Sequence, residues 1–204
     1  MDKTGMGVSI VNDPQMLPVG ATLQGGKYKV VAQLAHGGFG KTYKVWDSDL
    51  DECMALKELF ISGINERRSE QTSISLVATA DMTRSEQNKE LFETQQRKFR
   101  SEARRLFKLL HPNIVRVHTC FDENNTSYYV MDYIDGESLS ARLNRLQRPL
   151  TEDELMPLLP EILDALDYIH SKSIWHLDLK PANYQKRRFY YIELKSLFTF
   201  VAEY

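Results

Sequence analysis

Three side chains near the end of the chain have the types and spacing needed to transfer a phosphoryl group. Residues 175–183 read Trp-His-Leu-Asp-Leu-Lys-Pro-Ala-Asn, so they carry Asp178, Lys180 and Asn183 at fixed offsets. The aspartate can accept the proton of an attacking hydroxyl, the lysine can neutralise charge on the transferred group, and the amide oxygen can hold Mg²⁺. A polar loop after a helix can also contain these residue types, so this stretch alone leaves both interpretations open.

A glycine-rich turn lies between two predicted strands much earlier in the chain. Residues 28–34 and 41–46 are apolar or β-branched with polar interruptions, which indicates strands. Residues 35–40, Ala-His-Gly-Gly-Phe-Gly, connect them. The turn could be an ordinary hairpin, but glycines also let backbone N–H groups approach an anion closely, as a flap over phosphates requires.

A third predicted strand, residues 52–59, presents a small residue and a lysine on one face. Side chains alternate along a strand, so Ala55 and Lys57 share a face. A small residue there leaves room for a flat base, and the lysine provides a cation for phosphates. The alternative is a surface lysine on an edge strand, which is the commoner case for a lysine taken alone.

A helix is predicted after residue 98. Its apolar residues follow the helical spacing i, i+4, i+7, i+8 and i+11, and they are Phe99, Ala103, Leu106, Phe107 and Leu110. Glu102 lies at the edge of this apolar stripe, where its charge can reach across to the sheet. It can instead be a solvated helix charge, because arginines at 100, 104 and 105 are available as local partners.

The remaining elements are predicted from turns and caps. Pro112 ends the helix, a fourth strand reaches residue 121, and residues 128–133 form a fifth. Leucines at 139, 143 and 146 mark a short helix, and Thr151 with Glu154 forms a capping box. We expect that box to start one helix with a wide apolar face through residue 169, delayed or kinked by its two prolines. The polar residues 62–95 indicate an inserted loop, with some helix near its end.

The order of these features resembles the Ser/Thr protein kinases, with a bacterial character, over residues 28–183. Residues 175–183 are similar to the H-R-D-L-K-P-x-N catalytic loop of that family, and residues 35–40 to its G-x-G-x-F-G flap. Residues 54–57, Met-Ala-Leu-Lys, resemble its V-A-I-K strand, and residues 130–136 resemble its hinge. Lys180, two residues after the aspartate, matches the Ser/Thr pattern.

The resemblance implies an α+β, protein-kinase-like fold. It has a five-stranded antiparallel small lobe with one helix, followed by the beginning of the helical large lobe. The expected divisions are a flexible leader at 1–27, the small lobe at 28–134 with its insertion at 62–95, the start of the large lobe at 135–183, and an atypical tail at 184–204.

The same resemblance implies ATP and Mg²⁺ as cofactors and a protein substrate that carries serine or threonine. Asp178 would be the catalytic base, Lys180 would stabilise charge, and Asn183 would bind the metal. The residues expected to bind the nucleotide are Leu34, Gly37, Gly40, Ala55, Lys57, Glu102, Met131, Asp132 and Ile134. Among these, Glu102 would pair with Lys57, Met131 would be the gatekeeper, and the backbone of residues 132–134 would bind adenine.

The chain departs from the family pattern at three places. Ala35 replaces the first glycine of the flap, and Leu177 replaces the arginine of the catalytic loop. No aspartate follows Asp178, so the Asp-Phe-Gly that supplies the main Mg²⁺ ligand is absent. We expect a truncated or frameshifted kinase with impaired catalysis. The alternatives are a short form selected as such, a non-catalytic nucleotide-binding or scaffold module, and a non-functional fragment.

Composition excludes several other classes. The chain of 204 residues is 42% hydrophobic with a net charge of −2, which favours neither a nucleic-acid partner nor a membrane surface. It has no apolar run long enough to span a membrane, and two isolated cysteines do not indicate a disulfide or a metal site. We therefore expect a reduced, cytoplasmic setting.

Overall fold

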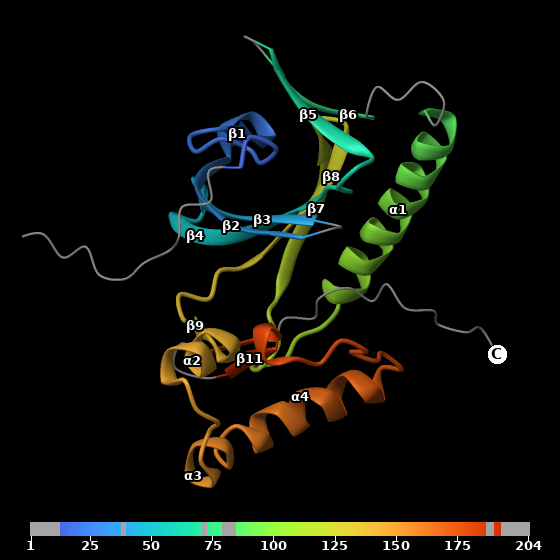
Figure 1. The fold of residues 1–204 in the computed structure, drawn as a ribbon. Coiled ribbons are helices and arrows are strands. Elements are labelled where there is room, and N and C mark those ends of the chain that lie inside the picture. Colours follow the sequence, from blue (N-terminus) through green and yellow to red (C-terminus); the bar gives the residue numbers. More distant parts are fainter. Residues whose placement is uncertain (1–12, 38–39, 71–72, 79–84, 187–189, 193–204) are drawn as a thin grey trace, which may run out of the picture. The chain divides into compact units, whose positions relative to one another are not determined.

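The computed structural model describes residues 13–37, 40–70, 73–78, 85–186 and 190–192 (Figure 1). The chain forms two compact units by its contacts. The first unit comprises residues 1–100 and 120–130, and the second comprises residues 101–119 and 131–204. Among the described residues, no helix combines the length and the apolar character needed to cross a membrane.

The first unit is built on a six-stranded sheet with the order β1-β2-β3-β4-β8-β7. Its strands are β1 (Thr22–Leu23), β2 (Tyr28–Gly37), β3 (Gly40–Asp47), β4 (Glu52–Leu59), β7 (Val117–Glu123) and β8 (Thr126–Asp132). The five predicted strands are present, and β1 is an additional short strand that pairs with the start of β2. β2, β3 and β4 pair as an antiparallel meander, as the turn chemistry between them predicts.

The two faces of the sheet differ in their residues. In the register of β3 and β4, Lys57 pairs with Thr42 and Ala55 with Lys44, so these side chains share what we call the front face. Alternate residues form the rear face, which holds the apolar core. The core residues are Met16, Leu17, Leu23, Tyr28, Val30, Tyr43, Val45, Met54, Leu56, Tyr128 and Val130.

The interpretation of residues 1–27 as a flexible leader is wrong for the described residues 13–27. Met16, Leu17 and Leu23 are buried on the rear face, and η1 (Gln24–Gly26) is a short 3₁₀ turn before β2. A turn at Asp13 directs this segment, because Asp13 accepts backbone hydrogen bonds from Gln15 and from Met16. The segment is irregular and has no period, so its burial could not be recognised from the sequence.

The predicted loop at residues 62–95 is also corrected. Residues 65–78 contain an antiparallel pair, β5 (Asn65–Glu70) and β6 (Ser73–Ala78), and α1 begins at Ser85 (Figure 1). Arg67 in β5 is buried although its surroundings in the sequence are polar. Its guanidinium is neutralised inside the protein, which composition alone could not reveal.

Helix α1 (Ser85–Leu106) confirms the predicted helix but ends earlier than its apolar stripe. Phe99, Ala103 and Leu106 are buried, whereas Phe107 and Leu110 lie beyond the helix and are exposed. The ring of Phe99 packs against Tyr129 of β8 on the front face, with ring centroids 5.0 Å apart. The prediction that Phe107 and Leu110 belong to the helix and pack on the core is therefore wrong.

The second unit is mainly helical in its central part. Its elements are β9 (Glu137–Ser138), α2 (Leu139–Leu146), α3 (Glu152–Leu155), α4 (Leu159–Ser171), η2 (Pro181–Asn183), β10 (Tyr184–Lys186) and β11 (Tyr190–Ile192). The three strands form a small sheet in the order β11-β10-β9. The short helix predicted from the leucines at 139, 143 and 146 is confirmed as α2.

The capping box at Thr151 and Glu154 is confirmed, but the single long helix is wrong. α3 ends at Leu155, and α4 starts at Leu159 with Pro160 in its first turn. Proline is tolerated in a first turn because its missing N–H would have no helical partner there. Pro157 lies in the turn between the two helices, so both prolines mark a break rather than a kink.

Candidate active site

The glycine turn of the first unit is a tight hairpin between β2 and β3. Gly37 pairs with Gly40 across it, and residues 38–39 at its tip lie outside the described part. A Cβ atom at Gly40 would lie 3.2 Å from the carbonyl oxygen of Glu58 and 3.6 Å from Lys57 Cε. Glycine at this position therefore lets the turn approach β4 closely at the lysine. Ala35 is not among the described residues with positive φ, so its Cβ carries no left-handed strain.

Lys57 and Ala55 lie beside each other on the front face. Ala55 is buried, and the ammonium of half-buried Lys57 lies 5.3 Å from the ring centroid of Tyr129. A cation at this distance from an aromatic face is attracted by the ring. Tyr129 was not predicted from the sequence. It lies close to Lys57 only because β8 is next to β4 in the folded sheet. Leu34 lies at an irregularity in the β2–β3 register between Gln33 and Ala35, and it is half-buried.

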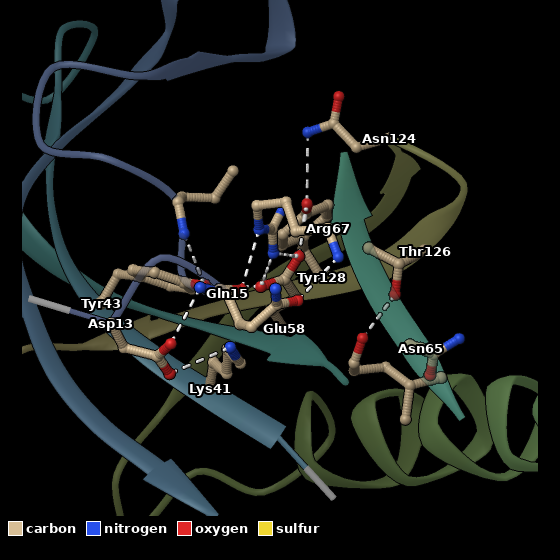
Figure 2. A network of polar contacts seen from close by, with 12 residues as sticks. Asp13, Gln15, Lys41, Tyr43, Glu58, Asn65, Arg67, Asn124, Thr126 and Tyr128 are labelled. Carbon is tan, nitrogen blue, oxygen red and sulfur yellow. Dashed lines mark hydrogen bonds and ion pairs between the residues drawn. The ribbon is translucent and has the colours of Figure 1, made fainter. Parts of the chain in front are cut away.

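A buried polar cluster lies behind the strand that carries Lys57. Glu58, the next residue, is 0% exposed and points to the rear face. Its carboxylate accepts hydrogen bonds from Tyr43 Oη at 2.6 Å, Tyr128 Oη at 2.9 Å and Arg67 Nη2 at 2.6 Å (Figure 2). Burial and the Glu58 charge raise the pKa of both tyrosines, so both remain neutral donors. Burial alone would lower the pKa of Arg67, but the Glu58 charge, the hydrogen bonds with Glu58 and the two neighbouring tyrosines together raise that pKa.

The predicted hinge residues form one continuous segment at the end of β8. Met131 is buried, while Asp132 and Ile134 are half-buried. The Asp132 carboxylate contacts His118 Nε2 at 2.6 Å and accepts the Arg116 N–H at 3.1 Å, while its own N–H donates to Arg116 O at 3.0 Å. The N–H of Asp132 is therefore occupied, and this donor is not available to a base. Glu102 is buried on α1.

The three predicted catalytic residues lie together in the loop between α4 and β10. Asp178 Oδ2 lies 2.7 Å from Lys180 Nζ, and both side chains are about half exposed. Asn183 is fully buried and donates from Nδ2 to the backbone oxygen of Asp178 at 2.8 Å. The hydrogen bond with Lys180 is the main cause that lowers the pKa of Asp178. The loop therefore presents the ionised Asp178 carboxylate beside the Lys180 ammonium, and the buried Asn183 amide is bonded to the Asp178 backbone.

The backbone at Leu177 is strained. Its φ is 51°, in the left-handed region, and the N–H of Asp178 bonds back to His176 O at 2.6 Å. A bond from residue i+2 to residue i with positive φ between them is the rare, strained form of the γ-turn. Such a conformation costs of order 1–3 kcal/mol and is found preferentially at functional sites. The strain here directly precedes the carboxylate of Asp178.

The fit of a magnesium ion depends on Asn183. Its Oδ1 atom is buried and has no hydrogen-bond partner in the described part of the chain. An amide oxygen is a suitable hard ligand for Mg²⁺, so this atom and the nearby Asp178 carboxylate fit the donor chemistry of such a site. However, no group of three or more His, Cys, Asp or Glu side chains suited to a metal occurs among the described residues.

Comparison with known sequences identifies relatives of one kind. The family described as "Protein kinase domain" matches residues 75–185. The serine/threonine-protein kinase B of Synechocystis is 31% identical over 164 residues, which cover 80% of this chain and 25% of that protein. A probable serine/threonine-protein kinase, PknB, of Lactococcus lactis is 29% identical over 158 residues, which cover 77% of this chain and 21% of that protein. The chain thus spans about a quarter or less of the length of these relatives.

Solved structures share the fold. The structure described as "PpkA-294 apo form" has a TM-score of 0.75 at 22% identity, and the match covers 88% of this chain and 61% of that one. The PknI kinase domain of Mycobacterium tuberculosis has a TM-score of 0.63 at 24% identity, and the match covers 87% of this chain and 61% of that one. At such identities the likeness shows the fold alone, and it agrees with the predicted α+β arrangement.

Proposed function

Because the chain belongs to the protein kinase family, we propose that it transfers the terminal phosphoryl group of ATP to a serine or threonine hydroxyl of a protein. The observation that carries this proposal is the arrangement of Asp178, Lys180 and Asn183 in one loop. The Asp178 carboxylate is ionised and exposed, so it can orient the hydroxyl and accept its proton. Lys180 can neutralise charge on the phosphoryl group as it moves.

We assign the remaining predicted residues to nucleotide binding. The residues for adenine are Leu34, Ala55, Met131, Asp132 and Ile134, and those for the phosphates are Gly37, Gly40, Lys57 and Glu102. Phe99 and Glu102 are one helical turn apart on α1, and the Phe99 ring packs on the same Tyr129 that lies beneath the Lys57 ammonium. This relation supports Glu102 as the partner that aims Lys57 at phosphates.

Magnesium would be held by Asn183 Oδ1, with Asp178 close by. When bound, the ion would neutralise negative charge on the phosphates. Residues 184–204 contain no aspartate, so they do not provide the second family ligand. We therefore propose that residues 1–204 by themselves catalyse phosphoryl transfer weakly. The lack of an aspartate in residues 184–204 also favours a second candidate function, a nucleotide-binding module without catalysis.

Our first prediction separates these two functions by measuring ATP binding and casein phosphorylation with purified protein. If the chain is a kinase, Asp178→Asn lowers turnover by about 100-fold or more, because the base is lost, and it leaves ATP affinity within about threefold. Asp167→Asn, which alters an exposed aspartate on α4, is the matched control and keeps native turnover. Lys57→Ala weakens both binding and turnover.

Binding of ATP that persists in EDTA, without turnover in any variant, would support the module instead. Failure of the native chain to bind ATP at all would contradict both functions.

A further inference from the structure

Residues 13–17, which we call the N-terminal clasp, contact both strands that flank the glycine turn. The backbone N–H of Asp13 donates to Gln33 Oε1 in β2 at 3.2 Å, and its carboxylate lies 3.3 Å from Lys41 Nζ in β3. At the other end of the clasp, Leu17 accepts from Gln33 Nε2 at 3.0 Å and donates to Tyr43 Oη at 3.1 Å. The clasp thus ties together the two strands that carry the turn. Figure 2 shows its contact with Lys41 of β3.

The contact with Lys41 lies at the base of the turn. Lys41 directly follows Gly40, and it pairs with His36 just before Gly37. Its side chain is only 3% exposed, and its ammonium lies 3.8 Å from the ring centroid of Phe60. Burial lowers the pKa of Lys41, and the hydrogen bond with Asp13 opposes this shift. A buried ammonium needs a nearby anion, so loss of the Asp13 charge would force Lys41 to move or to lose its proton.

The middle of the clasp reaches the strand that carries Lys57. Gln15 accepts from Arg67 at both its side-chain and backbone oxygens, at 2.8 and 2.9 Å. Arg67 in turn pairs with Glu58, the residue next to Lys57. The clasp therefore contacts β2 and β3 directly from the rear face, and it is linked to β4 through Arg67 and Glu58.

We propose that the N-terminal clasp positions the glycine turn, and that Asp13 does so by pairing with the buried Lys41 ammonium at the base of the turn. The proposal rests on the proposed function, because the turn acts on a nucleotide only if the chain binds one. Asp13 is a positioning residue, since it acts through Lys41 and lies on the face opposite Lys57. The clasp precedes residues 28–183, the stretch that carries the kinase motifs.

The test measures the Kd for ATP and amide hydrogen exchange in the full chain. Asp13→Asn raises the Kd about tenfold, a typical size for coupling between separate sites. In the ATP-free protein, amides of residues 33–37 and 40–42 exchange about tenfold faster, while those of α4 keep their native rates. Val45→Ala is the control for general stability, because Val45 is buried in the same core and its apolar side chain forms none of the polar contacts that join the clasp to β2 and β3. It lowers the unfolding temperature but leaves the Kd and the exchange of the turn at native values.

A double-mutant cycle identifies the route. If Asp13 acts through the Lys41 charge, Asp13→Asn changes the Kd by less than about twofold once Lys41→Met has removed that charge. An equal rise in Kd in both backgrounds would overturn the assignment to Lys41. A native chain that binds ATP, with unchanged Kd and unchanged exchange in Asp13→Asn, would overturn the positioning role itself.

The exchange measurement also separates this inference from the proposed function. If the native chain does not bind ATP, the proposed function fails. Faster exchange confined to the turn in Asp13→Asn then still supports the positioning role, and unchanged exchange contradicts it.

Discussion

Lys57 and Glu58 are neighbours in β4, and their side chains leave opposite faces of the sheet. The front residue is a candidate phosphate ligand, whereas the rear residue is locked by two tyrosines and Arg67. A buried carboxylate with three donors has little freedom to move, so the backbone that presents Lys57 is held from behind. Gly40 adds to this from the neighbouring strand, because its missing Cβ permits close contact at the Glu58 carbonyl.

The residue-scale prediction concerns the buried pair of Arg67 and Glu58. Arg67→Met leaves the Glu58 charge buried without its cation, and we expect a loss of about 3–5 kcal/mol in the free energy of unfolding at neutral pH. Denaturant unfolding at neutral pH measures this loss.

The double variant Glu58→Gln/Arg67→Met removes both charges and serves as the control. It should recover most of the stability at neutral pH. Equal stability of Arg67→Met and the native protein would contradict a structural role for the pair.

At the scale of elements, the break between α3 and α4 fixes the start of the helix that leads into the loop of Asp178. α3 and α4 are separate because Pro160 must lie in a first turn, and α4 then leads into the loop that holds Asp178. α3 is only four residues long, so it depends on its cap. Glu154 supports the cap by accepting the Thr151 N–H at 3.0 Å, and it pairs with Arg142 of α2 and with Arg148.

The element-scale prediction follows from the pKa of Glu154, which the hydrogen bond with Arg148 chiefly lowers from 4.5 to about 2. A carboxyl whose pKa is lower in the folded state stabilises the fold above its unfolded pKa, and this contribution is lost as pH falls through the folded value. We therefore expect the α3 cap to be intact above pH 4.5 and to loosen toward pH 2. NMR titration of the Glu154 carboxyl and of the Thr151 amide measures this directly.

Glu154→Gln is the variant for comparison, and its Thr151 amide should show no transition in that pH range. A Glu154 carboxyl that titrates near its ordinary pKa would contradict the cap geometry.

At the scale of the whole molecule, both units leave some large apolar side chains exposed. In the first unit Met16, Leu17 and Leu23 belong to the buried core, whereas Leu50 is exposed. In the second unit, Leu155, Met156 and Leu163 are exposed at 40%, 53% and 60% around the break between α3 and α4. Exposed apolar side chains of this size favour association with another apolar surface.

The whole-molecule prediction is that residues 1–204 self-associate through this group. Leu163→Lys should shift the sedimentation coefficient toward that of the monomer without changing the unfolding temperature, because Leu163 packs little inside the unit. Leu50→Lys is the matched control, since Leu50 is equally exposed at 55% but lies in a turn of the first unit. A native chain that sediments as a monomer at all concentrations would contradict this prediction.

Local patterns determined much of this protein. The grouping of Asp178, Lys180 and Asn183 could be predicted because they lie within six residues, and short loops bring such neighbours together without tertiary help. Strand alternation likewise placed Ala55 and Lys57 on one face, and the capping box followed from residues three positions apart. The strand order of the meander followed from its turns.

Tertiary structure decided what lies behind the site. Asp13 and Lys41 are 28 residues apart, and Tyr128 and Glu58 are 70 apart, so no local pattern joins them. Charged residues in a polar stretch indicate a solvated loop, and the burial of Arg67 depends on a carboxylate that only the folded sheet brings close. The early end of α1 and the packing of residues 13–27 are of the same kind. Both features depend on which apolar surfaces of the sheet remain uncovered, and those surfaces exist only once the sheet has formed.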